Sequence, residues 1–275
     1  MTDTQGYVLG VNTAELHRLG LQHQLWSEQT HALWERGAIR PGQTVLDIGA
    51  GPGYAACDLA QLVGPTGRVI ALDEAPMYLD HLRSQAEARG LTNIDVRKGD
   101  AQDVIGAGVQ PGSCDAAYAR WVICFVRDPG AVIAGAARAL KPGGALMLSD
   151  YFNYESMTLA PKSEVFTRTI AAVARSWRDR GGDPDVMARV PELLHEHDLE
   201  LRDIRVHVRV ARPGQMMWAW PDSFYRNFVP ELCRTGYLSE AERDAFLREW
   251  DARCANPHAF AQTPPVYDVL AIKRG

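Results

Sequence analysis

The strongest constraint on the fold is an alternation that repeats from residue 43 to residue 150. Short apolar runs that end in small or acidic residues are each followed by a segment with apolar residues at helical spacing. This pattern is typical of a parallel sheet whose strands are joined by helices. It predicts strands at Thr44–Asp47, Arg68–Asp73, Asn93–Arg97, Cys114–Arg120 and Ala145–Ser149, and helices at Tyr54–Val63, Pro76–Arg89 and from Asp128–Pro129 to Leu140.

The alternation stops after residue 150, and two later segments are interpreted as helical caps. Pro161–Arg178 has helical spacing where the next crossover is expected, and the aromatic-rich stretch Pro213–Ala261 is too long for a hairpin turn. The sheet is expected to continue with a helix at Val186–Glu196, a long strand at Leu199–Val210 with apolar residues alternating at Leu201, Ile204, Val206, Val208 and Val210, and a last strand at Val266–Ile272. The predicted domains are a helical lead-in (1–40), a core (41–150), a cap (151–184), and the end of the sheet (185–275) with a second cap at about 213–261.

The composition argues against several classes of function. The net charge is -5 and the basic residues are dispersed, so the attraction that brings nucleic-acid binders to phosphate is missing. The cysteines are scattered without a C-x-x-C pair, which favours neither disulfides nor a zinc site. The N-terminus has no signal pattern, and no apolar stretch is long enough for a membrane span. We therefore expect a cytoplasmic protein without a nucleic-acid partner, a membrane span or a metal.

The main chemical signal follows the first strand, where Asp47 precedes Gly49, Gly51 and Gly53. Glycines let the backbone turn sharply and approach a bulky ligand, and the N-terminus of the next helix offers free N–H groups. The nicotinamide fingerprint G-x-G-x-x-G would need glycine at the position of Tyr54, and the loop lacks the G-K-S/T ending of a P-loop. Both phosphate-binding alternatives lose support.

Two further signals follow the next strands. Asp73 ends the second strand, where a carboxylate can accept hydrogen bonds from both hydroxyls of a ribose. Gly99-Asp100-Ala101 follows the third strand, where it would place an acceptor near an adenine amino group. Each signal alone is a common loop feature, but the order of the three is informative.

Together these motifs resemble the class I S-adenosylmethionine-dependent methyltransferases. Val45 to Gly53 resembles the first motif of that family, Asp73 its ribose-binding acid, Gly99-Asp100-Ala101 its adenine-side turn, and Leu140-Lys141-Pro142-Gly143-Gly144 its turn before the fifth strand. The resemblance covers roughly residues 40 to 150. It implies a Rossmann-like α/β fold, a doubly wound seven-stranded sheet of order 3-2-1-4-5-7-6 with the last strand antiparallel.

The N-terminal stretch is similar to the lead-in of a bacterial subset of these enzymes that act on small molecules. In that subset the first helix closes over the cofactor, so Tyr7, Gln22 and Trp26 would reach its methionine end; an amphipathic packing helix is an equal alternative. Arg120 and Trp121 fall where the family places residues beside the methionine moiety, although Arg120 could instead form a surface salt bridge. The expected cofactor-binding residues are Tyr7, Gln22, Asp47, Gly49, Gly51, Gly53, Asp73, Met77, Asp100, Ala101, Arg120 and Trp121.

Aromatic residues after the fifth strand and in the caps predict a small, partly apolar or aromatic methyl acceptor. The expected acceptor-binding residues are Tyr151, Tyr154, Trp177, Trp218 and Tyr225, although any one of these rings could simply fill a cap core. His17, His23, Asp150 and Tyr151 are candidate bases, but none has a spacing signature and none is assigned.

The sequence thus predicts methyl transfer to O, N or C of a small molecule by in-line displacement. Enzymes that methylate adenine or glutamine carry a four-residue motif after the fourth strand: Asp, Asn or Ser, then Pro-Pro, then Tyr or Phe. This chain has Ala119-Arg120-Trp121-Val122 at that place. The alternatives that remain are a catalytically silent cofactor-binding subunit or regulator and a nicotinamide-dependent oxidoreductase.

Overall fold

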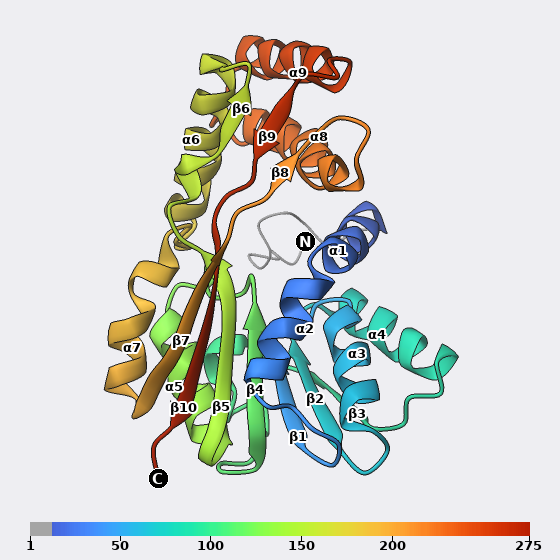
Figure 1. Cartoon of the computed structure of the whole chain (residues 1–275), viewed down its shortest axis with the longest axis vertical. Helices are drawn as coiled ribbons and strands as arrows, with labels where there is room; N and C mark the ends of the chain where they lie inside the picture. Colours follow the sequence, from blue (N-terminus) through green and yellow to red (C-terminus); the bar gives the residue numbers. More distant parts are fainter. Residues whose placement is uncertain (1–12) are drawn as a thin grey trace.

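The computed structural model describes residues 13–275, and a seven-stranded sheet forms its lower part (Figure 1). The spatial order is β3-β2-β1-β4-β5-β10-β7. The first five strands in that order are parallel, and β10 pairs antiparallel with both β5 and β7. The predicted order and the antiparallel last strand are confirmed. The strands are β1 (Thr44–Ile48), β2 (Arg68–Asp73), β3 (Ile94–Lys98), β4 (Cys114–Arg120), β5 (Leu140–Tyr151), β7 (Leu199–His207) and β10 (Val266–Lys273).

Helices cover both faces of this sheet because its central strands are apolar on both sides. Leu33 of α2 and Leu59 of α3 belong to the same hydrophobic cluster as Val45, whereas Val132 of α5 and Leu194 of α7 belong to the cluster that contains Leu46, the next residue of the same strand. Adjacent strand residues point to opposite faces, so two hydrophobic layers result. The helices are α1 (Thr13–Leu25), α2 (Ser27–Arg36), α3 (Tyr54–Val63), α4 (Pro76–Ala88), α5 (Pro129–Ala139) and α7 (Val190–Glu196), with short 3-10 turns at Ala101–Asp103, Tyr154–Ser156 and Val186–Ala188.

Both predicted caps are helical, and their helices begin where capping side chains occur. Ser163 accepts a hydrogen bond from the Phe166 amide at the start of α6, and Ser239 forms a capping box with Glu242 at the start of α9. The cap elements are β6 (Thr158–Ala160), α6 (Glu164–Asp179), β8 (Val210–Ala211), a 3-10 turn at Met216–Trp218, α8 (Ala219–Arg234), α9 (Glu240–Cys254) and β9 (Phe260–Gln262).

One part of the cap was not expected from the sequence. The strands β6, β9 and β8 form a small antiparallel sheet between the cap helices. The strand predicted to run from Leu199 to Val210 ends at His207, and Val210 already belongs to this second sheet. Strands of two or three residues are too short to produce a period-2 pattern, so only pairing between distant segments creates them.

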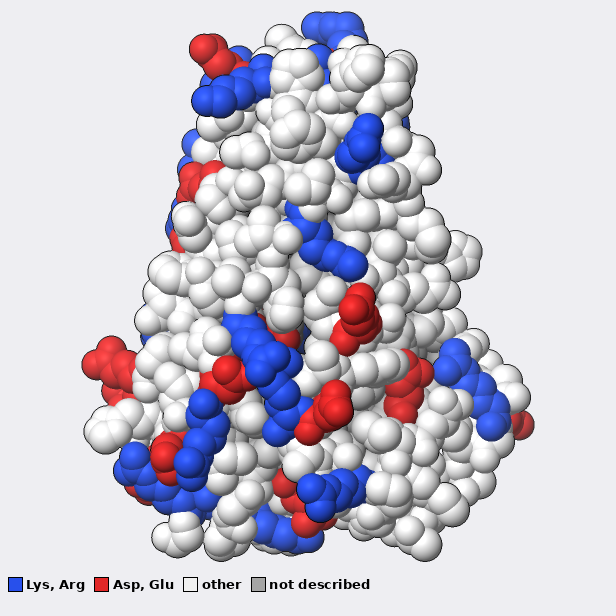
Figure 2. Space-filling view, viewed as in Figure 1, with Lys and Arg blue, Asp and Glu red and all other residues white. Residues whose placement is uncertain are grey.

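The cap stands above the carboxyl ends of the parallel strands, with α1 beside it (Figure 1). A single hydrophobic cluster joins the two parts, because Ile48 and Trp121 of the lower part belong to the same contiguous core as Phe166 and Tyr225 of the cap. On the face seen in Figure 2, acidic and basic side chains intermingle over the lower part, and the upper part is mostly uncharged. No helix within residues 13–275 has both the length and the apolar character needed to cross a bilayer.

Candidate active site

The predicted site residues meet at one edge of the sheet, where the parallel strands end. Asp47 lies near the end of β1, Asp73 ends β2, Asp100 follows β3, Arg120 ends β4 and Tyr151 ends β5. The carboxyl ends of parallel strands are where open α/β sheets collect ligands. The sheet order places β1 between β2 and β4, so the glycine loop lies between Asp73 and Arg120.

The three loop glycines have positive φ angles, but they serve different purposes. A Cβ on Gly49 would lie 2.5 Å from the Val122 side chain, and one on Gly53 would lie 2.2 Å from Leu82. These two glycines therefore permit close packing of the loop. A Cβ on Gly51, with φ of +54°, would meet no atom within 4 Å. Gly51 thus borders open space, as a loop that cradles a ligand should.

Asp73 organises this loop from the neighbouring strand. Its Oδ2 accepts a hydrogen bond from the Gly51 amide at 2.7 Å, and its Oδ1 accepts one from the Ala75 amide at 2.9 Å. Burial raises the pKa of this carboxyl, and the amides that hydrogen-bond to it oppose the shift. Each carboxylate oxygen has a second lone pair, so the side chain can still accept hydrogen bonds from ribose hydroxyls.

Asp47 is a buried carboxyl at the start of the same loop. Its side chain is 2% exposed, and its Oδ2 has no hydrogen-bond partner among the described residues. Burial raises its pKa to about 7, and the positive charge of Arg120 partly offsets this. A buried, unpaired acceptor beside a glycine cradle suits a ligand that brings a donor or a positive charge. The residues present therefore fit S-adenosylmethionine, whose methionine portion carries an ammonium group.

Arg120 ties the N-terminal helices to the sheet. It donates hydrogen bonds to Thr30 Oγ1 at 2.7 Å and to His23 Nδ1 at 2.9 Å. His23 Nε2 in turn lies 2.9 Å from Asp58 Oδ2. A guanidinium can only donate, so Nδ1 of the imidazole accepts and its Nε2–H donates to Asp58. The alternative of a surface salt bridge for Arg120 is wrong, because its partners are Thr30 and His23.

The other expected cofactor residues have diverse surroundings. Asp100 accepts from the Gln102 amide and begins the turn that contains Ala101, as the motif predicts. Met77 is 39% exposed in the first turn of α4. Gln22 is buried and its Oε1 accepts hydrogen bonds from Arg18 and Trp220. Tyr7 lies outside the described residues.

A pocket of about 590 Å³, counting its open mouth, lies where α1, the end of β5 and the cap meet. Four of the five expected acceptor residues line it, namely Tyr151, Tyr154, Trp177 and Tyr225. The complete lining among the described residues is Arg18, Gln22, Trp121, Phe125, Tyr151, Tyr154, Met157, Trp177, Trp220, Pro221, Phe224, Tyr225, Ala261, Gln262, Thr263 and Pro264.

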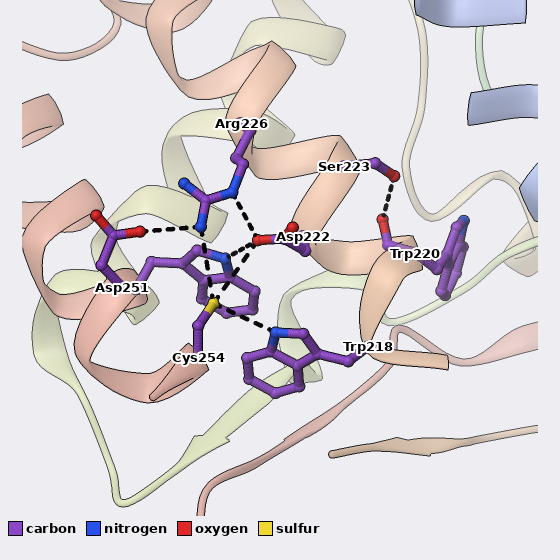
Figure 3. Close-up of polar contacts among 8 residues, drawn as sticks. Trp218, Trp220, Asp222, Ser223, Arg226, Asp251 and Cys254 are labelled. Atoms are coloured by element: carbon purple, nitrogen blue, oxygen red, sulfur yellow. Dashed lines mark hydrogen bonds and ion pairs between the residues drawn. The ribbon is translucent and has the colours of Figure 1, made fainter. Parts of the chain in front are cut away.

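Trp218, the fifth expected acceptor residue, lies away from this pocket. Its ring stacks on Trp250 with centroids 4.7 Å apart, and its Nε1 donates to the Cys254 sulfur at 3.4 Å. Asp222 closes the cluster by accepting from Arg226 and from Trp250. Figure 3 shows this network between α8 and α9, with the Trp220 ring lying apart from it. Trp218 therefore packs inside the cap, which is the alternative that the sequence left open.

Trp121 connects the glycine loop with the pocket. It follows β4 with a φ of +52°, a conformation that non-glycine residues seldom adopt. Its ring lines the pocket and packs against Tyr151 and Trp220 at centroid distances of 6.1 and 6.0 Å. The next residue, Val122, lies against Gly49. One short segment thus borders both the cofactor loop and the apolar cavity.

The candidate bases do not form a catalytic arrangement. Asp150 is 1% exposed and accepts from the amides of Cys124 and Tyr151, so it organises backbone after β4 and β5. Burial raises its pKa to about 6 and raises the pKa of Tyr151 well above the ordinary value. His23 is engaged by Arg120, and His17 is exposed on α1. Asp150 lies outside the pocket lining, so no base is assigned.

Several lining residues were not among the expected site residues. Arg18, Trp220, Gln262 and Thr263 come from segments far apart in the chain, although Trp220 is one of the aromatic residues of the predicted caps. For Arg18 a local signal existed, because Glu15, Arg18 and Gln22 are spaced to share one face of α1. Gln262 ends the short strand β9 and Thr263 follows it, and nothing in their local pattern indicated a site.

Comparison with known proteins agrees with this geometry. A family described as "Methyltransferase domain" matches residues 39–190. An arsenite methyltransferase of Aquipseudomonas alcaligenes is 37% identical over 119 residues, which cover 42% of this chain and 34% of that protein. The chain spans about a third of the length of such curated relatives.

Two solved structures share the fold. A methyltransferase structure from Bacillus halodurans superposes with a TM-score of 0.58 at 18% identity, covering 89% of this chain and 98% of that one. Haemonchus contortus phosphoethanolamine N-methyltransferase 2, solved with S-adenosyl-L-methionine, gives 0.58 at 19% identity, covering 90% of this chain and 53% of that one. With the glycine loop, the strand-end acids and a family match over more than half of its length, the chain belongs to the methyltransferase-domain family.

Proposed function

We propose that this enzyme transfers the methyl group of S-adenosylmethionine to a small organic molecule with an aromatic or largely apolar body. The observation that carries the proposal is the pocket at the junction of core and cap. Its wall is built mainly from aromatic rings, among them Trp121, Tyr154, Trp177 and Trp220. Aromatic walls of this kind favour planar, apolar ligands.

The place of the pocket also supports the proposal. Trp121 lines the pocket and the next residue, Val122, lies against Gly49 of the glycine loop, so donor and acceptor would meet beside Trp121. The cofactor supplies a methyl group that is already activated on a sulfonium. The protein then mainly has to hold the acceptor in line with that methyl group and exclude water.

We propose the cofactor set that the motifs imply, with the loop glycines, Asp47 and Asp73 as its centre. Gly51 would leave room for the cofactor, Asp73 would accept from its ribose, and Asp47 would face its positive methionine end. Asp100 and Ala101 would border the adenine. Tyr7, Gln22, Met77, Arg120 and Trp121 complete the set as residues around its periphery.

An inorganic acceptor is less well supported. One relative is named as an arsenite methyltransferase. Trivalent arsenic is thiophilic, so a site for it should present cysteines, as soft ions generally require. Cys57, Cys114, Cys124, Cys233 and Cys254 lie in separate parts of the chain, and the pocket lining contains none of them.

The test is methyl transfer from a tritium-labelled donor to a panel of hydroxylated aromatics, aromatic amines and sodium arsenite. We expect label in one or more aromatic acceptors. Transfer to arsenite alone would show that the proposal is wrong. Removal of the protein from the assay, and saturation with S-adenosylhomocysteine, serve as controls.

With an acceptor in hand, Trp177→Ala and Trp218→Ala form a matched pair. Both indoles are buried in the cap, and loss of either should cost about 3–5 kcal/mol of folding free energy. Only Trp177 lines the pocket. We expect Trp177→Ala to lower turnover by at least about tenfold relative to Trp218→Ala, while affinity for S-adenosylhomocysteine stays the same in both. Assays should run well below each variant's melting temperature, and equal turnover in the two variants would contradict the proposal.

A further inference from the structure

We propose that the pocket selects an aromatic acceptor that carries an acidic oxygen group, and that Arg18 recognises this group. Carboxylic acids, phenols and enols belong to this class. The inference rests on the proposed function, because it requires the pocket to hold the methyl acceptor. The inference adds that the acceptor carries an acidic group and that Arg18 is the residue that selects for this group.

The pocket lining carries a positive charge at Arg18. Among the described residues, Arg18 is the only charged side chain that lines the pocket. The other polar contributions come from neutral groups, such as Gln22, Gln262 and Thr263. The Arg18 side chain is 4% exposed. A buried cation beside an apolar wall attracts an anionic oxygen and repels a protonated amine more strongly than it would in water.

The guanidinium of Arg18 is held in place by hydrogen bonds to its neighbours. Arg18 Nε and Nη2 donate to the two carboxylate oxygens of Glu15 at 2.7 and 2.6 Å. Its Nη1 donates to Gln22 Oε1 at 2.9 Å, and Trp220 Nε1 donates to the same oxygen at 2.8 Å. Glu15 is not part of the pocket lining, so the positive partner of the pair faces the cavity. The planar guanidinium is therefore oriented before any ligand arrives.

The electrostatic field of Arg18 reaches hydroxyl groups inside the cavity. Burial raises the pKa of both Tyr151 and Tyr154, and the positive charge of Arg18 opposes the rise at each. Both phenols line the pocket. The charge of Arg18 would act in the same direction on the hydroxyl or carboxyl of a bound ligand, favouring its anionic form against the opposing effect of burial.

The test uses three probes with one ring system: 2-naphthoate, 2-naphthalenemethanol and 2-naphthylmethylammonium. Their affinities are measured by calorimetry with the whole chain, saturated with S-adenosylhomocysteine, at neutral pH. We expect 2-naphthoate to bind about tenfold or more tightly than the ammonium compound, with the neutral alcohol between them. If the ammonium compound binds equally well or better, the inference is wrong while the pocket remains an acceptor site. If none of the three binds, the proposed function fails together with the inference.

The charge-neutral variant Glu15→Gln/Arg18→Gln tests the role of Arg18 by removing both charges of this ion pair together. We expect it to lose the preference for 2-naphthoate while still binding the alcohol. The matched control is Glu231→Gln/Arg234→Gln, which removes another Glu–Arg pair with the same spacing, on α8 and away from the pocket. The control should keep the preference. Arg18→Lys, which retains the charge, should keep part of it. Full selectivity in the charge-neutral variant would assign the effect to another group and overturn the inference.

Discussion

At the residue scale, Asp73 holds the glycine loop and is also the proposed ribose acid. Asp73→Ala removes the acceptor for a ribose and also the acceptor for the Gly51 and Ala75 amides. We expect S-adenosylhomocysteine affinity to fall by about 1.5–3 kcal/mol, the range for hydrogen bonds to a charged group, measured by calorimetry. Asp95→Ala is the control, because Asp95 lies on the adjacent strand and pairs with Arg68 and Arg97. An unchanged affinity in Asp73→Ala would exclude it as the ribose acid.

Gly51 and Gly53 provide a second contrast between binding and folding. Gly51→Ala places its methyl group in open space, so it should cost only about 1 kcal/mol of stability for the left-handed backbone. The same methyl group should nevertheless weaken cofactor binding, because the ligand must approach this backbone. Gly53→Ala should mainly destabilise the fold, because its Cβ would overlap Leu82. Calorimetry and urea unfolding on both variants decide the matter, and normal cofactor binding by Gly51→Ala would argue against the loop as the site.

At the scale of elements, α1 and α2 depend on a histidine for their attachment. Arg120 of β4 contacts His23 of α1 and Thr30 of α2, and His23 contacts Asp58 of α3. Burial is the main cause that lowers the pKa of His23 below 6.5, helped by Arg120 and opposed by Asp58. The geometry agrees with this direction, because a proton on Nδ1 would face the Arg120 donor.

This attachment should make stability depend on pH in a defined direction. The unfolded histidine returns to a pKa of 6.5, so below that pH the unfolded state binds more protons than the folded state. The stability contributed by neutral His23 is present above this pH and is lost as the pH falls below it. We expect His23→Gln, which can still accept from Arg120 and donate to Asp58, to lose less stability between about pH 7 and pH 5. Urea unfolding across this range measures it, with the exposed His258→Gln as control, and parallel curves for all three proteins would refute the explanation.

The apolar alternation predicts the position of strand β7 but not the burial of its side chains. The strand forms where predicted and pairs with β10. Its alternating residues Ile204 and Val206 are nevertheless 45% and 51% exposed, because β7 is the edge of the sheet and no helix covers this part of it among residues 13–275. Alternation thus identifies the strand, whereas its burial depends on which helix packs over it.

At the scale of the whole molecule, cap and core should unfold together. The largest hydrophobic cluster runs without a break from Ile48 in β1 through Trp177 to Trp250 in α9. We expect one cooperative transition in calorimetry, with tryptophan fluorescence and far-ultraviolet circular dichroism changing together. Saturation with S-adenosylhomocysteine at a hundred times its dissociation constant should stabilise the whole molecule by about 2.7 kcal/mol. Two separate transitions, with only one shifted by the ligand, would mean that the cap is an independent unit.

Local patterns were sufficient for the core and for the strand ends at which the proposed cofactor site lies. The strands around Asp47 and Asp73, the intervening helices and the Asp128–Pro129 helix start all form where the sequence predicts them. Hydrophobic period, glycine conformation and capping chemistry act over a few residues, so one stretch of sequence carries them. The order of the strands followed from the family that these motifs resemble.

Only the tertiary structure decided which residues line the aromatic pocket. Trp177 and Trp218 are the same residue type in the same aromatic-rich region, yet one lines the cavity and the other stacks inside the cap. Arg18 and Thr263 are distant in sequence and share one wall. Local patterns specify which residues need burial, but the side each ring faces depends on how α1, the end of β5 and the cap pack together. That packing is a property of contacts between distant segments, and no local period encodes it.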